Sequence, residues 1–77
     1  MIDFELNDMR PTYCKLERWN KTVHCELHHY PVDGYWEWQV TWATKEKWCK
    51  SEWSGRHFST AEEAFENMKE YINGFQS

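Results

Sequence analysis

The chain has 77 residues and a formal net charge of -4, from 9 Lys and Arg against 13 Asp and Glu. This length suits one domain, so residues 1–77 are expected to fold as a single unit. Aromatic residues make up 18% of the chain, with six Trp, although the mean hydropathy is strongly polar at -0.98. The composition therefore excludes a membrane span, a low-complexity chain and a chain with too little apolar surface to fold.

Most of the chain has the alternating apolar and polar pattern of β-strands. A short strand is predicted at the start, where Ile2, Phe4 and Leu6 alternate with acidic residues. Further strands are predicted at about residues 12–18, 22–30, 35–43 and 47–53, with turns near 19–21, 31–34 and 44–46. The strand at 35–43 has the clearest pattern, because every second residue from Trp36 is apolar.

The register of these strands predicts one apolar sheet face. If residues 31–34 form a loop, Tyr30 pairs with Tyr35 and Leu27 with Trp38. A turn at 44–45 in the same way places Trp53 on the face of Trp36. The predicted core face carries Cys14, Leu16, Val23, Cys25, Leu27, Trp36, Trp38, Val40, Trp42, Cys49 and Trp53.

The C-terminal part predicts one helix. Ser59 and Thr60 are each followed three residues later by Glu, which is a capping-box pattern, and Gly74 is a stop signal. The apolar residues at helical spacing are Ala61, Ala64, Phe65, Met68, Tyr71, Ile72 and Phe75. We therefore expect an α+β fold, an antiparallel β-meander of four to five strands with one C-terminal helix packed on one face.

One helix covers only one face of a sheet, so the second face is expected to meet water or a partner. That face is predicted to carry aromatic side chains among charges, which is typical of interface centres. The alternative is that cross-strand aromatic pairs simply stabilise an exposed sheet. The candidate partner-binding residues are Tyr13, Glu26, His28, Tyr30, Tyr35, Glu37, Trp48 and Glu52.

Four His and three Cys raise the question of a metal site. His24 and His28 share a face, but four residues of strand separate them by about 13 Å, too far for one ion. The chain has no C-x-x-C pair, and no H-x-x-x-H pair lies on a predicted helix. We therefore expect no metal and no other cofactor.

The cysteines indicate a reducing compartment and no catalysis. An odd count of three, with no signal-peptide pattern at the start, predicts a cytoplasmic protein. Cys14 and Cys25 can lie opposite each other across the first hairpin, so their spacing leaves a disulfide open. Because the cysteines fall on the core face and Glu26 and Glu37 on an open one, no enzymatic activity is expected.

Residues 35–40 (YWEWQV) and 55–64 (GRHFSTAEEA) resemble the plant ethylene-response-factor DNA-binding domain. The resemblance implies a three-stranded sheet followed by a helix, and a small DNA-binding or regulatory domain as one candidate function. The chain departs from the family by one additional residue between Gly55 and Phe58. Where the family reads the major groove with Arg and Trp, this chain has Glu37, Gln39, Thr41, Lys50 and Glu52. This face and the acidic net charge disfavour direct binding to nucleic acid.

In size, acidity, Trp-rich sheet and single helix, the chain also resembles the small bacteriophage proteins that block host defences, such as anti-CRISPR and anti-restriction inhibitors. This resemblance implies a non-enzymatic inhibitor in the host cytoplasm. Its expected partner is a host protein with a basic, nucleic-acid-binding surface. A homodimeric structural accessory protein is the third hypothesis, because an edge strand or the aromatic face also suits self-association.

Overall fold

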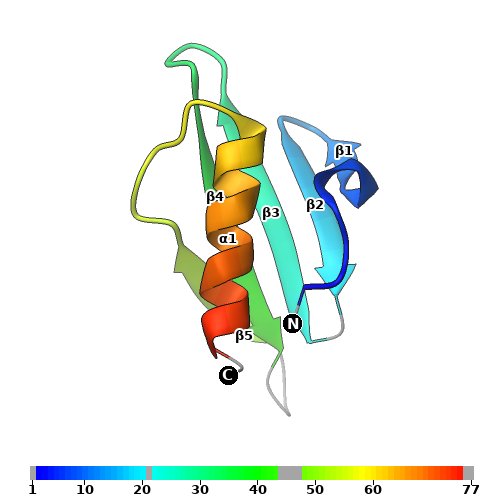
Figure 1. Ribbon diagram of the computed structural model, residues 1–77. Coiled ribbons are helices and arrows are strands. Elements are labelled where there is room, and N and C mark those ends of the chain that lie inside the picture. Colours follow the sequence, from blue (N-terminus) through cyan, green and yellow to red (C-terminus); the bar gives the residue numbers. More distant parts are fainter. Residues whose placement is uncertain (1, 21, 44–47, 76–77) are drawn as a thin grey trace.

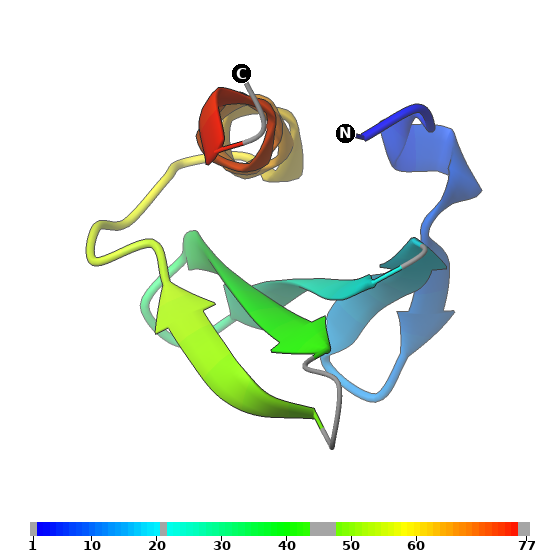
Figure 2. The same ribbon diagram turned by 90° about the horizontal axis from the view of Figure 1, so that it is seen from below.

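The computed structural model describes residues 2–20, 22–43 and 48–75, with the backbone alone at 48–50 and 75. Its elements are η1 (Leu6–Asp8), β1 (Arg10–Thr12), β2 (Lys15–Asn20), β3 (Val23–Tyr30), β4 (Tyr35–Ala43), β5 (Trp48–Trp53) and α1 (Ala61–Phe75). The five antiparallel strands form one sheet in the order β1-β2-β3-β4-β5. Helix α1 and the N-terminal segment lie on the same side of this sheet (Figure 1, Figure 2). The predicted α+β meander with one helix is confirmed.

The central hairpin β3–β4 has the predicted register. The pairs across it include Tyr30 with Tyr35, Leu27 with Trp38, Cys25 with Val40 and Val23 with Trp42. Because side chains alternate between faces, the apolar members of these pairs share the side of α1, where Cys25, Leu27 and Val40 are fully buried. Gly34, with φ 75°, closes the hairpin and donates its N–H to the Tyr30 carbonyl at 2.7 Å.

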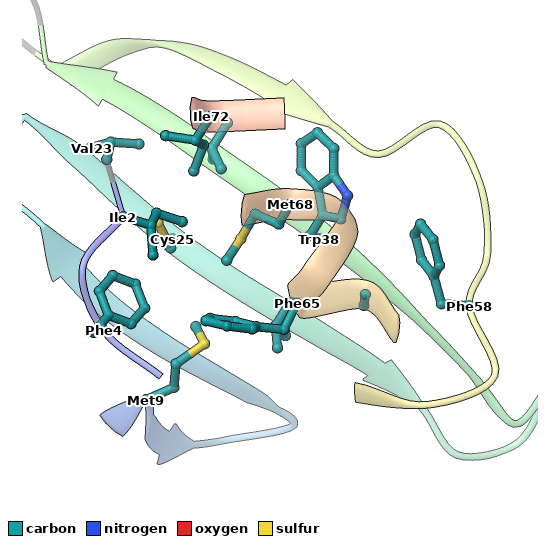
Figure 3. Packing of buried hydrophobic residues seen from close by; sticks show 13 residues of the cluster. Ile2, Phe4, Met9, Val23, Cys25, Trp38, Phe58, Phe65, Met68 and Ile72 are labelled. Carbon is teal, nitrogen blue, oxygen red and sulfur yellow. The ribbon is translucent and has the colours of Figure 1, made fainter. Parts of the chain in front are cut away.

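Helix α1 begins where the capping pattern predicted. The Glu63 N–H donates to Thr60 Oγ1 at 3.1 Å and so satisfies one of the free amides of the first turn. The predicted apolar stripe faces the sheet, and Figure 3 shows Phe65, Met68 and Ile72 among the side chains of the core. The indole of Trp38 on β4 donates to Asn67 Oδ1 at 2.8 Å, which joins the helix to the sheet by a polar contact as well.

The strand predicted at the N-terminus is wrong. Residues 2–5 belong to no strand, and Leu6–Asp8 form the short helix η1. Ile2 and Phe4 are nevertheless buried, and the ring of Phe4 lies 5.9 Å from that of Phe65 on α1. The alternating pattern therefore reflects alternate burial beside the helix rather than strand pairing.

The strand predicted over residues 12–18 is interrupted at Cys14. Cys14 adopts a left-handed φ of 59° and forms, with Tyr13, the turn between β1 and β2. Because a left-handed residue cannot continue an extended strand, the chain reverses here and Cys14 is exposed instead of joining the core. Arg18, not Cys14, lies opposite Cys25, and both of these cysteines are free thiols.

The predicted register of β5 is also wrong. Glu52 pairs with Val40 and Trp53 with Gln39, after a register irregularity beside Ala43 that adds one residue to β5. A shift of one residue exchanges the two faces of a strand. Trp53, predicted in the core, is therefore on the face opposite the helix and is 46% exposed, whereas Glu52 lies on the helix side.

Removal of the Thr60 hydroxyl tests the helix cap. We expect Thr60→Ala to lower the free energy of unfolding by about 1 kcal/mol, because the Glu63 N–H loses its acceptor. Urea denaturation followed by tryptophan fluorescence measures this change. Ser59→Ala, one residue further from the helix, is the control, and an equal loss in both variants would contradict the assignment of Thr60 as the cap.

Burial raises the pKa of the Cys25 thiol from 9.0 to about 12. The folded protein therefore holds a neutral thiol at a pH where the unfolded chain already releases the proton. This contribution to stability is complete below pH 9 and is lost as the pH rises towards 12. We expect urea midpoints of Cys25→Ala to fall less steeply over this range than those of the parent protein. Parallel declines would show that Cys25 does not contribute.

Candidate functional site

The face of the sheet opposite α1 has no described element packed across it (Figure 2). We call this surface the open face. It is defined by the strand register, because paired residues share a face. It carries Arg10, Thr12, Lys15, Glu17, Trp19, His24, Glu26, His28, Tyr30, Tyr35, Glu37, Gln39, Thr41, Ser51 and Trp53.

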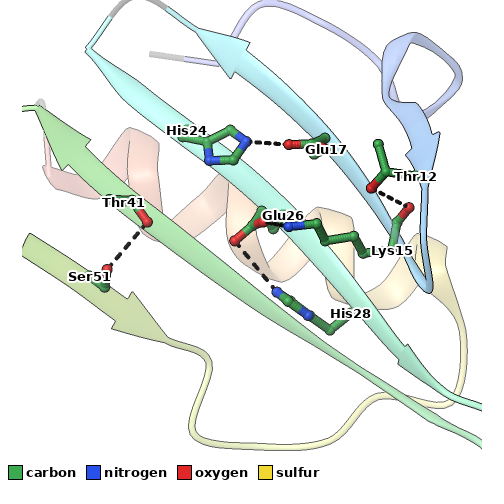
Figure 4. Close-up of polar contacts among 8 residues, drawn as sticks. All are labelled: Thr12, Lys15, Glu17, His24, Glu26, His28, Thr41 and Ser51. Atoms are coloured by element: carbon green, nitrogen blue, oxygen red, sulfur yellow. Dashed lines mark hydrogen bonds and ion pairs between the residues drawn. The ribbon is translucent and has the colours of Figure 1, made fainter. Parts of the chain in front are cut away.

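A buried carboxylate lies at the centre of the open face. Glu26 is only 6% exposed and pairs directly with Glu17 across β2 and β3. Two carboxylates in this position repel each other. The repulsion is offset by Lys15, whose ammonium donates to Glu26 Oε2, and by His24, whose Nε2 lies 2.7 Å from Glu17 Oε1 (Figure 4).

These contacts shift the ionisation of the neighbouring groups. The hydrogen bond to Glu26 raises the pKa of the Lys15 ammonium above its ordinary value. The hydrogen bond with His24 lowers the pKa of the Glu17 carboxyl. Both shifts favour the charged forms of Lys15 and Glu17, so hydrogen bonds and an ion pair hold the polar cluster together on a face with no described helix over it.

His28 lies two residues after Glu26 on β3, in the direction opposite to His24. Its Nε2 lies 3.5 Å from Glu26 Oε1, but the atom is buried and makes no hydrogen bond to any residue that the structure describes. A buried polar atom without a partner is unusual in a folded protein. This nitrogen is therefore the one polar atom of the described cluster whose bonding is incomplete.

Two exposed tryptophans frame this polar cluster. Trp19 is 58% exposed and its ring stacks on His24 at 4.1 Å with an interplanar angle of 14°. Trp53 is 46% exposed and its ring lies 5.0 Å from His28. Each indole is thus supported by a histidine of β3 while about half of its surface faces solvent.

The tyrosines of the open face are packed against each other. The rings of Tyr30 and Tyr35 lie 4.8 Å apart, and His57 stacks on Tyr35 at 3.7 Å with an interplanar angle of 10°. His57 is held there because Phe58 exchanges two backbone hydrogen bonds with Trp36 on β4. Tyr30 and Tyr35 are both half-buried, and this burial raises the pKa of the Tyr30 hydroxyl.

The structure places most, but not all, of the predicted partner-binding residues on the open face. Located there as predicted are Glu26, His28, Tyr30, Tyr35 and Glu37. Tyr13 lies in the turn before β2 and is 92% exposed. Trp48 pairs with Ala43 through its backbone, and its side chain lies outside the described residues. The predicted position of Glu52 on the open face is wrong, because the added residue in β5 turns it towards α1. There its charge, after burial of the phenol itself, raises the pKa of Tyr71.

Neither exposed tryptophan of this surface was predicted from the sequence. Trp19 was expected in a turn, but β2 continues to Asn20, which pairs with Val23. A shorter predicted turn before β3 would have placed Trp19 correctly. The alternation of β2 then continues through Trp19 and brings its side chain to the face of Glu17. Trp53 carried no such signal, because the irregularity in β5 has no mark in the local sequence.

No protein-family model, curated protein or solved structure matches this chain. Within the ranges that the structure describes, no helix has the length and apolar character needed to cross a membrane. The function is therefore inferred from the open face itself.

The ion pair at the centre of the open face can be tested by stability measurements. Lys15→Met removes the ammonium but keeps the length of the side chain. We expect it to lower the free energy of unfolding by roughly 1–3 kcal/mol, because the mostly buried Glu26 carboxylate loses its counterion. The double variant Lys15→Met/Glu26→Gln also removes the negative charge and is expected to recover part of this loss. A double-mutant cycle without coupling would contradict the pairing.

Proposed function

We propose that this protein is a non-enzymatic, cytoplasmic inhibitor that binds another protein through the open face. The observation that carries the proposal is the pair Trp19 and Trp53, which are exposed on one uncovered sheet face and supported by histidines. Tryptophan is the residue type most enriched among those that dominate binding energy. An indole already held in place loses little conformational freedom when a partner covers it.

The polar cluster between the tryptophans supports the same function. Glu26 is paired with Lys15, and Glu17 lies within hydrogen-bond distance of His24, so both central carboxylates already have protein partners when water is displaced. The hydrogen bonds from Lys15 to Glu26 and between His24 and Glu17 also make this part of the surface rigid. The open face therefore offers two apolar anchors on a framework that is formed before binding.

Charge favours a basic site on the partner. The net charge of the chain is -4, and α1 contributes Glu62, Glu63, Glu66 and Glu70 against Lys69. Such a protein is attracted to the positive surfaces with which proteins handle nucleic acids. A phage-encoded inhibitor of a host defence or nucleic-acid-handling protein fits these features.

The open face gives less support to direct DNA binding. Its cations among the described residues are Arg10 and Lys15, against three carboxylates, Glu17, Glu26 and Glu37. Since phosphate neutralisation supplies most of the affinity for DNA, this balance gives little attraction. The DNA-binding alternative and the homodimer are therefore kept as outcomes of the test.

The proposed anchors are tested together in Trp19→Ala/Trp53→Ala. The tagged parent protein is used to capture a partner from bacterial lysate, and the partner is then purified and titrated. We expect the double variant to bind this partner at least about 30-fold more weakly, because each truncation removes a buried anchor. Val32→Ala, at a site that is 98% exposed in the β3–β4 turn, is the control and is expected to bind normally.

Three results would contradict the proposal. Equal binding of the double variant and the parent protein would exclude the open face as the docking surface. A dimer in light scattering that dissociates in the double variant would assign this face to self-association. Affinity for DNA at about 50 mM salt that falls steeply as salt increases would favour the DNA-binding alternative.

A further inference from the structure

The polar cluster of the open face contains three side chains whose donor atoms converge. One ligand atom from each of Glu17, His24 and Glu26 lies within 4.8 Å of the other two. The strand register causes this convergence, because Glu17 lies directly opposite Glu26 and His24 lies two residues along β3 on the same face. Figure 4 shows His24 of β3 and Glu17 of β2 turned towards each other, and the Glu26 carboxylate on the same face of the sheet, turned towards Lys15 and His28.

Two further observations point to a ligand at this place. The Glu26 side chain is 8% exposed, so a carboxylate is held nearly out of water at the surface of a sheet. His28 Nε2 is buried, lies 3.5 Å from Glu26 Oε1 and has no hydrogen-bond partner in the described part of the chain. The nearly buried carboxylate favours a cation beside it, and the unpartnered nitrogen shows that the polar bonding around Glu26 is incomplete among the described residues.

We propose that Glu17, His24 and Glu26 bind a divalent transition-metal ion of the Zn²⁺ class and leave its fourth position open to a solvent molecule. Imidazole nitrogen and carboxylate oxygen together suit Zn²⁺ and its transition-metal neighbours, whereas Mg²⁺ and Ca²⁺ prefer oxygen alone. Donor atoms around a tetrahedral Zn²⁺ lie roughly 3–4 Å apart, so the side chains need to close by only about 1 Å. The site thus takes its donors from two neighbouring strands instead of from a local motif.

Lys15 gives the site an internal competitor. Its ammonium occupies Glu26 Oε2 and is itself a cation that the metal must displace. Removal of this ammonium should therefore strengthen metal binding, whereas removal of a donor should weaken it. Opposite effects of two substitutions in one cluster distinguish a metal site from non-specific attraction to acidic residues.

The site is tested by calorimetric titration of the folded chain with Zn²⁺, and by the visible absorption of Co²⁺ as a reporter of coordination. We expect one saturable site per chain and no competition from Mg²⁺. Glu17→Gln and His24→Gln should each weaken binding at least about tenfold, and Lys15→Met should tighten it. Circular dichroism checks that each variant is folded. Glu17→Gln keeps the test decisive if His24→Gln does not fold, because the Glu17 side chain is only half-buried.

Two matched controls exclude other donors. His57→Gln replaces an exposed imidazole outside the cluster, and Cys14→Ser replaces an exposed thiol, so both should leave the affinity unchanged. The proposal is overturned if no saturable binding occurs, or if binding survives both donor substitutions and is lost in Cys14→Ser. The inference does not rest on the proposed inhibitor function, since the titration contains no partner protein.

Discussion

The register of the β3–β4 hairpin is the constraint on which the rest of the structure depends. Once Tyr30 pairs with Tyr35, Leu27 and Trp38 must lie on one side of the sheet. The same pairing sends His24 and Glu26 to the other side, because neighbouring residues of a strand point in opposite directions. The apolar side gathers α1 and the N-terminal segment over it, and the polar side remains uncovered (Figure 2). One set of backbone hydrogen bonds therefore defines both the core and the open face.

Two paired carboxylates, Glu17 and Glu26, lie at the centre of the open face. Pairing of β2 with β3 brings Glu17 opposite Glu26, and the cluster is stable because Lys15 and His24 each face one carboxylate. The histidines of β3 have a second role, since His24 supports Trp19 and His28 supports Trp53. The polar cluster and the apolar anchors are thus parts of one arrangement. A metal ion bound to His24 would change the support of Trp19, which connects the proposed ion site to the proposed docking surface.

Much of this arrangement could be predicted from the sequence, but the predictions failed where the backbone departs from regular alternation. The β3–β4 hairpin was predicted correctly, because Trp38, Val40 and their partners alternate without interruption. The helix was predicted correctly from its capping pattern and its apolar spacing. Cys14 interrupts the strand predicted at 12–18 by adopting a left-handed conformation, which its residue type does not indicate. In β5, one additional residue exchanged Glu52 and Trp53 between faces, so an anchor of the candidate site was first assigned to the core.

The sequence by itself determined the meander, the central register and the cap of the helix, because these depend on contacts between residues close along the chain. The tertiary structure decided which side chains share the open face. Glu17 and His24 converge only through the pairing of β2 with β3, and Trp53 joins them only through an irregularity in β5. A shift of one residue in a strand moves a side chain to the opposite side of the sheet. The composition of a surface built from several strands is therefore decided only when every strand has found its partner.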